Sequence, residues 1–322
     1  MQPKNVSNKR ILISVLNWGM GHVSRSIGLI NQLISQENDI FIACDENQKN
    51  IFKEYFPTEN YISHDGYPFH FSGKGNFALD LLKSSKGLSS RMKMEYSQVA
   101  KYIEEHQINL VLSDHRYGFR SDKVPSIFIT HQLNLPVKWY QSMIQKRHVK
   151  LMKRFSEVWI LDYSDNRLAG KLSKKIEGVN ASYVGPYSRF MLYDLKEKDT
   201  DSILITSGPL VYAQQFLNEQ LKNELKKKFK VIAPPETTIA EEIQRLSNNW
   251  KTQDKELLTC KKIISRSGYS SVMDVHFLQC EFQFYPTRLA FLNWIMDHFN
   301  WSLACQGDWL LRLLVEALVG CH

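Results

Sequence analysis

Short apolar runs rich in β-branched residues alternate with segments of helical hydrophobic spacing in the first half of the chain. An apolar run between turn residues is typical of a buried strand, and apolar residues three and four positions apart indicate a helix face. This alternation predicts a parallel sheet with helices on both faces. The expected strands are 11–16, 40–44, 109–113, 126–130 and 157–161, and the expected helices are 23–36, 46–56, 79–105 with a break near Gly87, and 137–155.

The alternation stops around residues 182–201 and then begins again. A short strand at 182–184 leads into Gly185-Pro186, and the charged stretch DLKEKDTD follows. These features are typical of a domain boundary, so we expect domains at 1–186 and 187–322. The fold class we predict is α/β, with two Rossmann-like domains facing across a cleft. In the second domain we expect strands at 202–206, 229–233, 261–265 and 281–285, and helices at 212–228, 238–247, 254–259 and from about Ser270.

The stretch NWGMGHVSR, residues 17–25, joins the first strand to the first helix. Gly19 and Gly21 remove Cβ atoms from this turn, and His22 stands where the helix begins. Free backbone N–H groups at such a helix start favour negative charge and a closely approaching ligand. The turn lacks the GxxxxGK[ST] pattern, and Ser24 replaces the third glycine of GxGxxG. An ordinary strand-to-helix turn is the alternative interpretation.

Four of the expected strands in the first half are followed by a polar residue, namely Asp45, Asp114, His131 and Asp162. In an open parallel sheet the carboxyl ends of the strands line the ligand crevice. These four side chains are therefore the first candidates for chemistry in this domain. For each of them singly, helix capping or a role in loop structure is the alternative.

A second glycine-bearing turn spans residues 265–274, SRSGYSSVMD. Gly268 permits close approach, and the N–H and hydroxyl groups of Ser267 and Ser270 are suited to hold a diphosphate at the helix start. Asp274 lies one turn into the helix, where its carboxylate can accept hydrogen bonds from ribose hydroxyls. The alternative is a self-capping helix with a favourable acid in its first turn. We also assign Arg266 to this candidate diphosphate and ribose site, together with Ser207 and Gly208 of the turn that follows the strand at 202–206.

Composition narrows the class of protein but not its activity. The 322 residues carry a net charge of +8, which suits anionic substrates or an anionic membrane surface. No basic arm or zinc-finger spacing indicates nucleic acid. Five scattered cysteines without CxxC spacing favour reduced thiols over a disulfide scaffold or a zinc site. With a polar N-terminus and no apolar run of the roughly 18–20 residues that a spanning helix needs, we expect a cytoplasmic location.

The chain resembles the GT-B nucleotide-sugar glycosyltransferases, and more closely the family 28 branch that includes the enzyme adding N-acetylglucosamine to lipid I. The resemblance covers about residues 10–287. It rests on the segments WGMGHVSRS (18–26), VGPYSRF (184–190) and ISRSGYSSVMD (264–274). The resemblance implies that Ser267, Gly268 and Asp274 contact the donor's diphosphate and ribose. It also implies that the loop carrying Gly19, Gly21 and His22 faces the acceptor and the donor phosphates.

The activity that this resemblance implies is inverting transfer of a sugar, N-acetylglucosamine or a related hexose, from a UDP-sugar. The acceptor would be lipid-linked or a glycan, with a peripheral contact at the inner face of the cytoplasmic membrane. No DxD motif follows an expected strand, so we expect no metal and no other cofactor. His22 and Asp114 are the candidate bases by placement, and His131 is a third candidate on the acceptor side.

The segment after Pro286 departs from the family pattern. The family carries a Gln-x-x-Gln-like segment there that binds sugar hydroxyls, whereas here Arg288-Leu289-Ala290-Phe291 follows. The tail 288–322 also contains no lysine and three of the seven tryptophans. Two alternatives to transfer therefore stay open: a UDP-sugar 2-epimerase of the same architecture, and a non-catalytic nucleotide- or glycan-binding relative.

Overall fold

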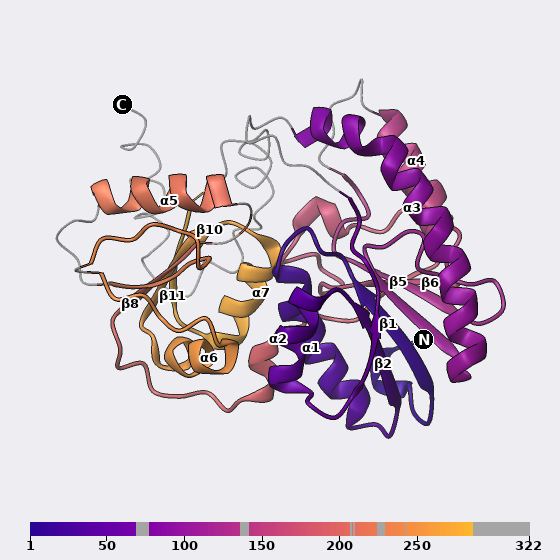
Figure 1. Ribbon diagram of the computed structural model, residues 1–322, viewed down its shortest axis with the longest axis horizontal. Coiled ribbons are helices and arrows are strands. Elements are labelled where there is room, and N and C mark those ends of the chain that lie inside the picture. Colours follow the sequence, from indigo (N-terminus) through magenta and orange to yellow (C-terminus); the bar gives the residue numbers. More distant parts are fainter. Residues whose placement is uncertain are drawn as a thin grey trace.

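The computed structural model describes residues 1–68, 77–135, 142–206, 208, 210–223, 229–241 and 243–285, whose strands form two separate parallel sheets (Figure 1). The expected α/β class with two Rossmann-like units is confirmed. The first sheet contains β1 (Arg10–Val15), β2 (Asp39–Cys44), β3 (Asn60–Ser63), β4 (Leu110–Asp114), β5 (Ser126–Thr130), β6 (Glu157–Ile160) and β7 (Ala181–Tyr183). The second contains β8 (Ser202–Ile205), β9 (Phe229–Ile232), β10 (Lys262–Arg266) and β11 (Glu281–Tyr285).

The strand order places the ends of particular strands side by side. The first sheet has the order β3-β2-β1-β4-β5-β6-β7, so the direction of chain progression reverses between β1 and β4. There Val15 pairs with Asp114, and the turn 17–20 and helix α1 follow directly after β1. The second sheet has the order β11-β10-β8-β9 and reverses between β8 and β10. Open α/β sheets bind ligands at such reversal points, and both glycine-bearing turns lie at one.

Helices cover the sheets and meet between them. In Figure 1, α7 lies between the second sheet and helix α1, and α6 lies beside α2. The helices are α1 (Gly21–Ile34), α2 (Glu46–Tyr55), α3 (Phe77–His106), α4 (Ser142–Met152), α5 (Leu210–Asn223), α6 (Trp250–Thr259) and α7 (Tyr269–Leu278), with 3₁₀ turns η1 (Pro3–Asn5), η3 (Gly170–Ser173) and η4 (Arg189–Leu192). None of the helices in the described ranges is both long and apolar enough to cross a membrane.

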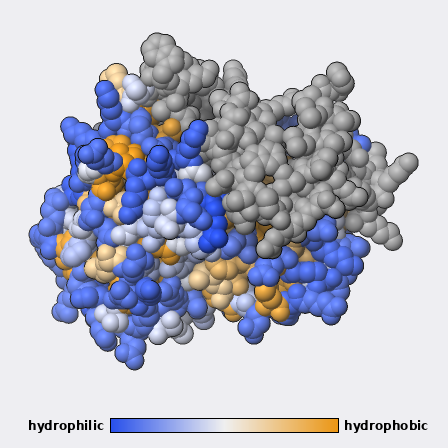
Figure 2. All heavy atoms as spheres, turned by 180° about the vertical axis from the view of Figure 1, so that it is seen from behind, coloured by the Kyte–Doolittle hydropathy of each residue, from blue (hydrophilic) through white to orange (hydrophobic). Residues whose placement is uncertain are grey.

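The hydrophobic cores explain this packing. Apolar side chains of β1 and α1, including Ile13, Val23 and Ile27, form a core that also takes in Met273 of α7. Burying one such side chain contributes about 1.5–3 kcal/mol, so the shared core holds the two units together. Viewed from behind, the described surface is mostly hydrophilic, with small separate apolar areas (Figure 2).

The expected elements were largely confirmed, with the following differences. Strand β3 was missed, because its sequence NYIS has a single aliphatic residue and no regular alternation of apolar and polar residues. Helix α3 runs through Gly87 without the expected break, since one glycine costs a helix only about 1 kcal/mol. Helix α6 begins at Trp250, earlier than expected, because Asn249 caps it by accepting from Thr252 N–H. The predicted helix 137–155 begins at Ser142 in the described part, and residues 136–141 lie outside it.

The predicted helix at 238–247 is wrong. The described residues of this segment run beside β9, where Leu246 N–H donates to the Val231 carbonyl at 2.8 Å and Val231 N–H donates to the Gln244 carbonyl at 2.9 Å. Ile239 and Ile243 pack against the second unit's core. Hydrogen bonds to the edge strand β9 satisfy the backbone N–H and C=O groups that a helix would satisfy internally. The apolar spacing alone therefore could not distinguish a helix from an extended segment here.

Candidate active site

A histidine, a carboxylate and an arginine meet at the reversal point of the first sheet. His22 occupies the first turn of α1, and Asp114 is the last residue of β4. The His22 Nδ1 and Asp114 Oδ1 atoms lie 3.1 Å apart. Asp114 is fully buried, whereas 19% of the His22 side chain is exposed. The structure therefore brings together the two residues that we predicted as candidate bases.

Arg25 binds the same carboxylate and was missed in the sequence. Its Nε donates to Asp114 Oδ2 at 2.8 Å, and its Nη2 donates to Oδ1. Its Nη1 lies 3.1 Å from Nδ1 of His131, which stands after β5. Arg25 lies three positions after His22, the spacing that places two helical residues on one face. That spacing is the signal in the sequence that points to Arg25.

Burial and charge set the protonation states of this cluster. Burial alone would raise the pKa of Asp114, but the nearby Arg25 and His22 outweigh it and hold that pKa well below its ordinary value. Burial lowers the pKa of His22, and the charge of Arg25 lowers it further against the opposing effect of Asp114. Burial likewise lowers the pKa of His131. The cluster therefore contains a carboxylate and neutral imidazoles near pH 7.

His115 is a second residue that the sequence did not indicate. Its ring lies 5.3 Å from the ring of His22 and 5.8 Å from that of His131. The backbone of His115 has φ +59°, a left-handed conformation that is uncommon for residues other than glycine. Its Nε2 lies 2.6 Å from the Thr130 hydroxyl. Strained backbone is concentrated at functional sites, and here it directs a third imidazole towards the cluster.

The other two polar strand ends have structural roles. Asp45 caps α2 by accepting a hydrogen bond from Gln48 N–H at 2.9 Å. Asp162 is fully buried and accepts from the backbone of Ala169 at 2.9 Å and from the Ser173 hydroxyl at 2.6 Å, which fixes the loop after β6. The capping and loop alternatives thus hold for these two, whereas Asp114 and His131 belong to the cluster.

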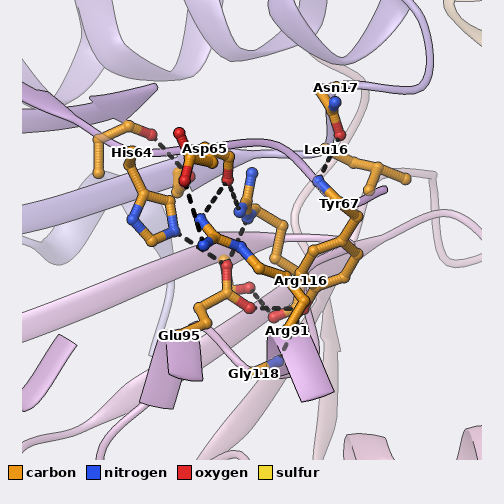
Figure 3. Close-up of polar contacts among 12 residues, drawn as sticks. Leu16, Asn17, His64, Asp65, Tyr67, Arg91, Glu95, Arg116 and Gly118 are labelled. Carbon is orange, nitrogen blue, oxygen red and sulfur yellow. Dashed lines mark hydrogen bonds and ion pairs between the residues drawn. The ribbon is translucent and has the colours of Figure 1, made fainter. Parts of the chain in front are cut away.

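A buried polar network fixes the loop that precedes His22 (Figure 3). Glu95 of α3 accepts from Arg116 Nε at 2.7 Å and from the Tyr67 hydroxyl, and it lies 3.1 Å from His64 Nε2. Tyr67 N–H in turn donates to the Asn17 side-chain oxygen at 2.9 Å. Charged hydrogen bonds in a buried network are strong and geometrically specific. They hold the turn 17–19 against the 64–67 segment.

Two glycines let α1 approach the second unit and the segment 184–190. A Cβ on Gly21 would lie 2.8 Å from the Cβ of Ser270 in α7, which is too close. A Cβ on Gly28 would lie 3.0 Å from the carbonyl carbon of Ser188. By contrast, a Cβ on Gly19 would meet nothing within 4 Å. Gly21 is therefore required for helix packing as the structure stands, and Gly19 leaves open space in the turn.

Asp274 and Arg189 connect the second unit to α1. The Asp274 carboxylate accepts from the Ser188 hydroxyl at 2.6 Å, from Ser24 at 3.1 Å and from Arg189 Nη1 at 2.9 Å. Arg189 Nε also donates to Asp254 of α6 at 2.5 Å. Burial raises the pKa of Asp274, against the opposing effect of Arg189. The expected ribose contact of Asp274 stays a prediction, and it requires one of these partners to give way.

The remaining residues of the predicted nucleotide site surround the start of α7. Gly268 directly precedes the helix, and a Cβ placed on it would meet only the Ser271 hydroxyl at 3.8 Å. Ser267 N–H donates to the Tyr285 carbonyl at 3.1 Å. The guanidinium carbon of Arg266 lies 5.1 Å from the centre of the Phe216 ring. Gly208 has φ +88°, which suits glycine, whereas Ser207 and the tail from residue 286 lie outside the described residues.

Tyr269, the first residue of α7, brings this second turn to the histidine cluster. Its ring stacks on the ring of His131 with centroids 4.0 Å apart. Its hydroxyl donates to the backbone carbonyl of Leu161 in the first unit. The histidine cluster of the first unit and the glycine-bearing turn of the second unit are therefore in direct contact through this pair.

No protein-family model matches this sequence, and the comparison with curated proteins also finds no match. Solved structures do match. The glycotransferase of kitacinnamycin has a TM-score of 0.59 at 13% identity, over 87% of this chain and 80% of the other. The glycosyltransferase SsfS6 of Streptomyces sp. SF2575, complexed with thymidine diphosphate, has a TM-score of 0.54 at 13% identity, over 90% and 85%. The chain has the GT-B fold.

A third similar structure, the spinosyn forosaminyltransferase SpnP, has a TM-score of 0.52 at 12% identity, over 87% of this chain and 81% of the other. At such identities the likeness establishes the arrangement of the two units and not the chemistry. The expected fold class is confirmed on this second ground, whereas the domain limits of 1–186 and 187–322 remain predictions.

Proposed function

We propose that the protein is a glycosyltransferase that moves a sugar from a nucleoside diphosphate to an acceptor hydroxyl. The observation that carries the proposal is the His22–Asp114 pair at the reversal point of the first sheet, next to the glycine-bearing turn of the second unit. The three structures compared above are named as glycosyltransferases, and one of them contains thymidine diphosphate. Their shared fold supports the same class of reaction for this chain.

In the proposed reaction His22 is the general base. With its proton on Nδ1, the ring donates to Asp114 Oδ1 and keeps a free electron pair on Nε2. Nε2 takes the proton of the acceptor hydroxyl as the oxygen forms a bond to the sugar's anomeric carbon. The bond from that carbon to the diphosphate breaks, and its electron pair leaves on the phosphate oxygen. A direct displacement of this kind inverts the configuration at the anomeric carbon.

The leaving diphosphate carries the charge that must be stabilised. The first-turn N–H groups of α7 have no carbonyl partner within the helix, and the open space beside Gly268 allows phosphate oxygens to approach them. We assign Ser267, Gly268 and Ser270 to the diphosphate and Asp274 to the ribose. In the structure the Asp274 carboxylate accepts hydrogen bonds from Ser24, Ser188 and Arg189. To contact the ribose, Asp274 must give up at least one of these hydrogen bonds.

The finer assignments are part of this proposal. The donor is a UDP-sugar carrying N-acetylglucosamine or a related hexose, and no metal takes part. The acceptor is lipid-linked or a glycan, which would place the protein in the cell envelope pathway and at the inner face of the cytoplasmic membrane. The net charge of +8 supports an anionic acceptor or membrane surface.

The proposal is tested by His22→Gln, which keeps a polar side chain and removes the base. Thermal-shift titrations with UDP and thymidine diphosphate measure nucleotide binding, and release of the diphosphate from UDP-N-acetylglucosamine with glycan acceptors measures transfer. We expect nucleotide affinity within about twofold of the parent and turnover lower by about 10²–10⁴-fold. Turnover of UDP-N-acetylglucosamine without any acceptor would favour the epimerase, and tight nucleotide binding without turnover would favour the binding protein.

A further inference from the structure

We propose that Arg25 is a positioning residue for the His22–Asp114 pair, because it fixes the carboxylate with two N–H groups and keeps a positive charge beside the imidazole. The inference rests on the proposed function, since a base at His22 is what needs to be positioned. Nothing in the sequence motifs or the likeness to known structures assigns a role to this arginine.

The hydrogen bonds from Arg25 fix the orientation of the Asp114 carboxylate. Nε holds Oδ2 at 2.8 Å and Nη2 holds Oδ1, so both carboxylate oxygens are fixed by one planar group. The side chain is 2% exposed, so water competes little for these bonds. Only arginine among the basic residues offers two parallel N–H donors in a rigid plane. A lysine in its place would keep the charge and lose the geometry.

The same arginine acts on His22 directly. Its Nη2 lies 2.7 Å from His22 Nδ1, and both atoms face Asp114 Oδ1. Two protonation states of the neutral ring are compatible with this triangle. If Nδ1 carries the proton, both nitrogens donate to Oδ1 and Nε2 is free to act as a base. If Nδ1 accepts from Arg25, the proton sits on Nε2 and His22 cannot act as one. Our inference requires the first state.

The titratable groups around His22 come from three elements. Arg25 belongs to the same helix as His22, and Asp114 ends β4 with His115 directly after it. His131 stands after β5, with its ring beside that of His115. The pKa of His22 is lowered by burial and then by Arg25, with Asp114 opposing. Removing the arginine leaves the carboxylate as the dominant charge. The imidazole would then take up a proton more readily, and a protonated His22 cannot accept one from the acceptor.

The experiment is an NMR titration of ¹⁵N-histidine-labelled protein, with His22→Gln to assign the signal. In the parent we expect a neutral His22 with its proton on Nδ1. In Arg25→Gln we expect the His22 pKa to rise by about one to three units. The acid limb of the pH–turnover profile should move up by the same amount, so that turnover lost at pH 7 returns at higher pH. An Nε2–H signal in the parent, or an unmoved pKa in the variant, would overturn the inference.

Two further variants keep the test decisive. Arg25→Lys retains the charge, so the His22 pKa should stay near that of the parent while turnover falls by about tenfold or more. If Arg25→Gln fails to fold, Arg25→Lys decides alone: turnover equal to the parent's would contradict the inference. The control is Arg120→Lys, which alters an arginine that pairs with a different carboxylate, Asp122, and should leave the His22 pKa unchanged.

The titration separates this inference from the proposed function. It follows the His22 imidazole without any substrate, so it gives a result even if no donor and acceptor pair is turned over. A parent without transfer activity would contradict the proposed function. An unmoved His22 pKa in an active enzyme would contradict only the role of Arg25.

Discussion

The ring of His131 stacks on the ring of Tyr269 with centroids 4.0 Å apart and planes inclined by only 8°. The first residue follows β5 of the seven-stranded sheet, and the second begins α7 of the four-stranded sheet. Because His131 also contacts Arg25, the stack links the start of α7 to the His22–Asp114 pair. Movement of the second unit relative to the first must therefore break or re-form a contact beside the proposed base.

The stack and its hydrogen bond predict a graded effect at Tyr269. Tyr269→Phe keeps the ring and removes the bond to the Leu161 carbonyl, so we expect a loss of about 0.5–1.5 kcal/mol in unfolding free energy. Tyr269→Leu also removes the aromatic pair, which is worth about another 0.5–1.5 kcal/mol. Urea denaturation measures both variants. Equal stability of the two would show that the stack contributes nothing.

The close approach of Gly21 to Ser270 predicts a rescue between the two helices. A Cβ at Gly21 would lie 2.8 Å from the Ser270 Cβ, so Gly21→Ala must push α1 and α7 apart. Overpacking of this kind typically costs about 1–3 kcal/mol. Ser270→Gly removes the clashing atoms, and the double variant should regain most of the lost stability in thermal melts. Gly19→Ala, whose Cβ would meet nothing within 4 Å, is the control.

If the double variant is as unstable as Gly21→Ala alone, the loss of stability comes from the turn and not from the contact with α7. The distinction matters because the sequence predicts that the glycines of the turn 17–20 allow a ligand to approach. The structure shows that Gly21 also lets a helix of the second unit approach, and the approach of a ligand stays a prediction.

Gly268 offers a cleaner test of the nucleotide site. Its backbone conformation, φ −87° and ψ 142°, suits alanine, and the added Cβ would meet only the Ser271 hydroxyl at 3.8 Å. Gly268→Ala should therefore fold normally. If phosphate oxygens approach this position, the methyl group should weaken UDP binding by about tenfold or more in calorimetric titrations, equivalent to about 1.4 kcal/mol. Gly87→Ala, on α3, is the matched control, and an affinity loss confined to Gly268→Ala is the expected result.

Much of this site follows from the sequence because the ends of the strands can be located from local apolar runs. Asp114 and His22 each stand next to an apolar run, and parallel strands bring the ends of such runs to one edge. The segment 238–247 shows the limit of that reasoning. Ile239 and Ile243 have helical spacing, yet the edge of β9 offered backbone partners that no local pattern reveals.

The contacts between the two units were out of reach for the same reason. Tyr269 was part of a recognised motif, but its stacking on His131 depends on how α7 packs against the first unit. Arg189 belongs to the segment VGPYSRF, and its bonds to Asp254 and Asp274 also depend on tertiary packing. The sequence therefore indicated the residues of each turn but not the contacts between the two turns.

The buried network around Glu95 predicts loss of stability in acid. Burial alone would raise the pKa of Glu95, but hydrogen bonds and charge from His64 and Arg116 hold it below its ordinary value of 4.5. Burial lowers the pKa of His64 from 6.5. Both pKa values are lower in the folded state than in the unfolded state. The two groups therefore contribute their full stabilisation to the folded state at a pH above their ordinary pKa values. It is lost as the pH falls, first below about 6.5 for His64 and then below about 4.5 for Glu95.

Glu95→Gln tests this network. The variant leaves the Arg116 charge buried without its carboxylate, so we expect a loss of about 3–5 kcal/mol at pH 7. Its unfolding free energy should also depend less steeply on pH below about 4.5, where the parent loses the contribution of Glu95. Urea denaturation at pH 7 and over this pH range gives both quantities. A variant with the parent's slope would assign the acid sensitivity to other carboxylates.

Asp274 has two proposed roles, and paired variants separate them. In the structure its carboxylate accepts from Ser24, Ser188 and Arg189, which joins α7 to the first unit. Ser188→Ala removes one of these bonds and should cost about 0.5–1.5 kcal/mol in stability while leaving UDP affinity unchanged. Asp274→Ala removes the acceptor of all three and should cost more.

The ribose role adds a second expectation for Asp274→Ala. Loss of a hydrogen bond to a charged group is worth about 1.5–3 kcal/mol, or about tenfold to hundredfold in affinity for UDP. Calorimetric titration at a temperature where each variant is fully folded measures this affinity, and urea denaturation measures stability. If Asp274→Ala lowers stability and binds UDP like the parent, the carboxylate only joins the two units. If it loses both, Asp274 exchanges its partners in the first unit for the ribose when the nucleotide binds.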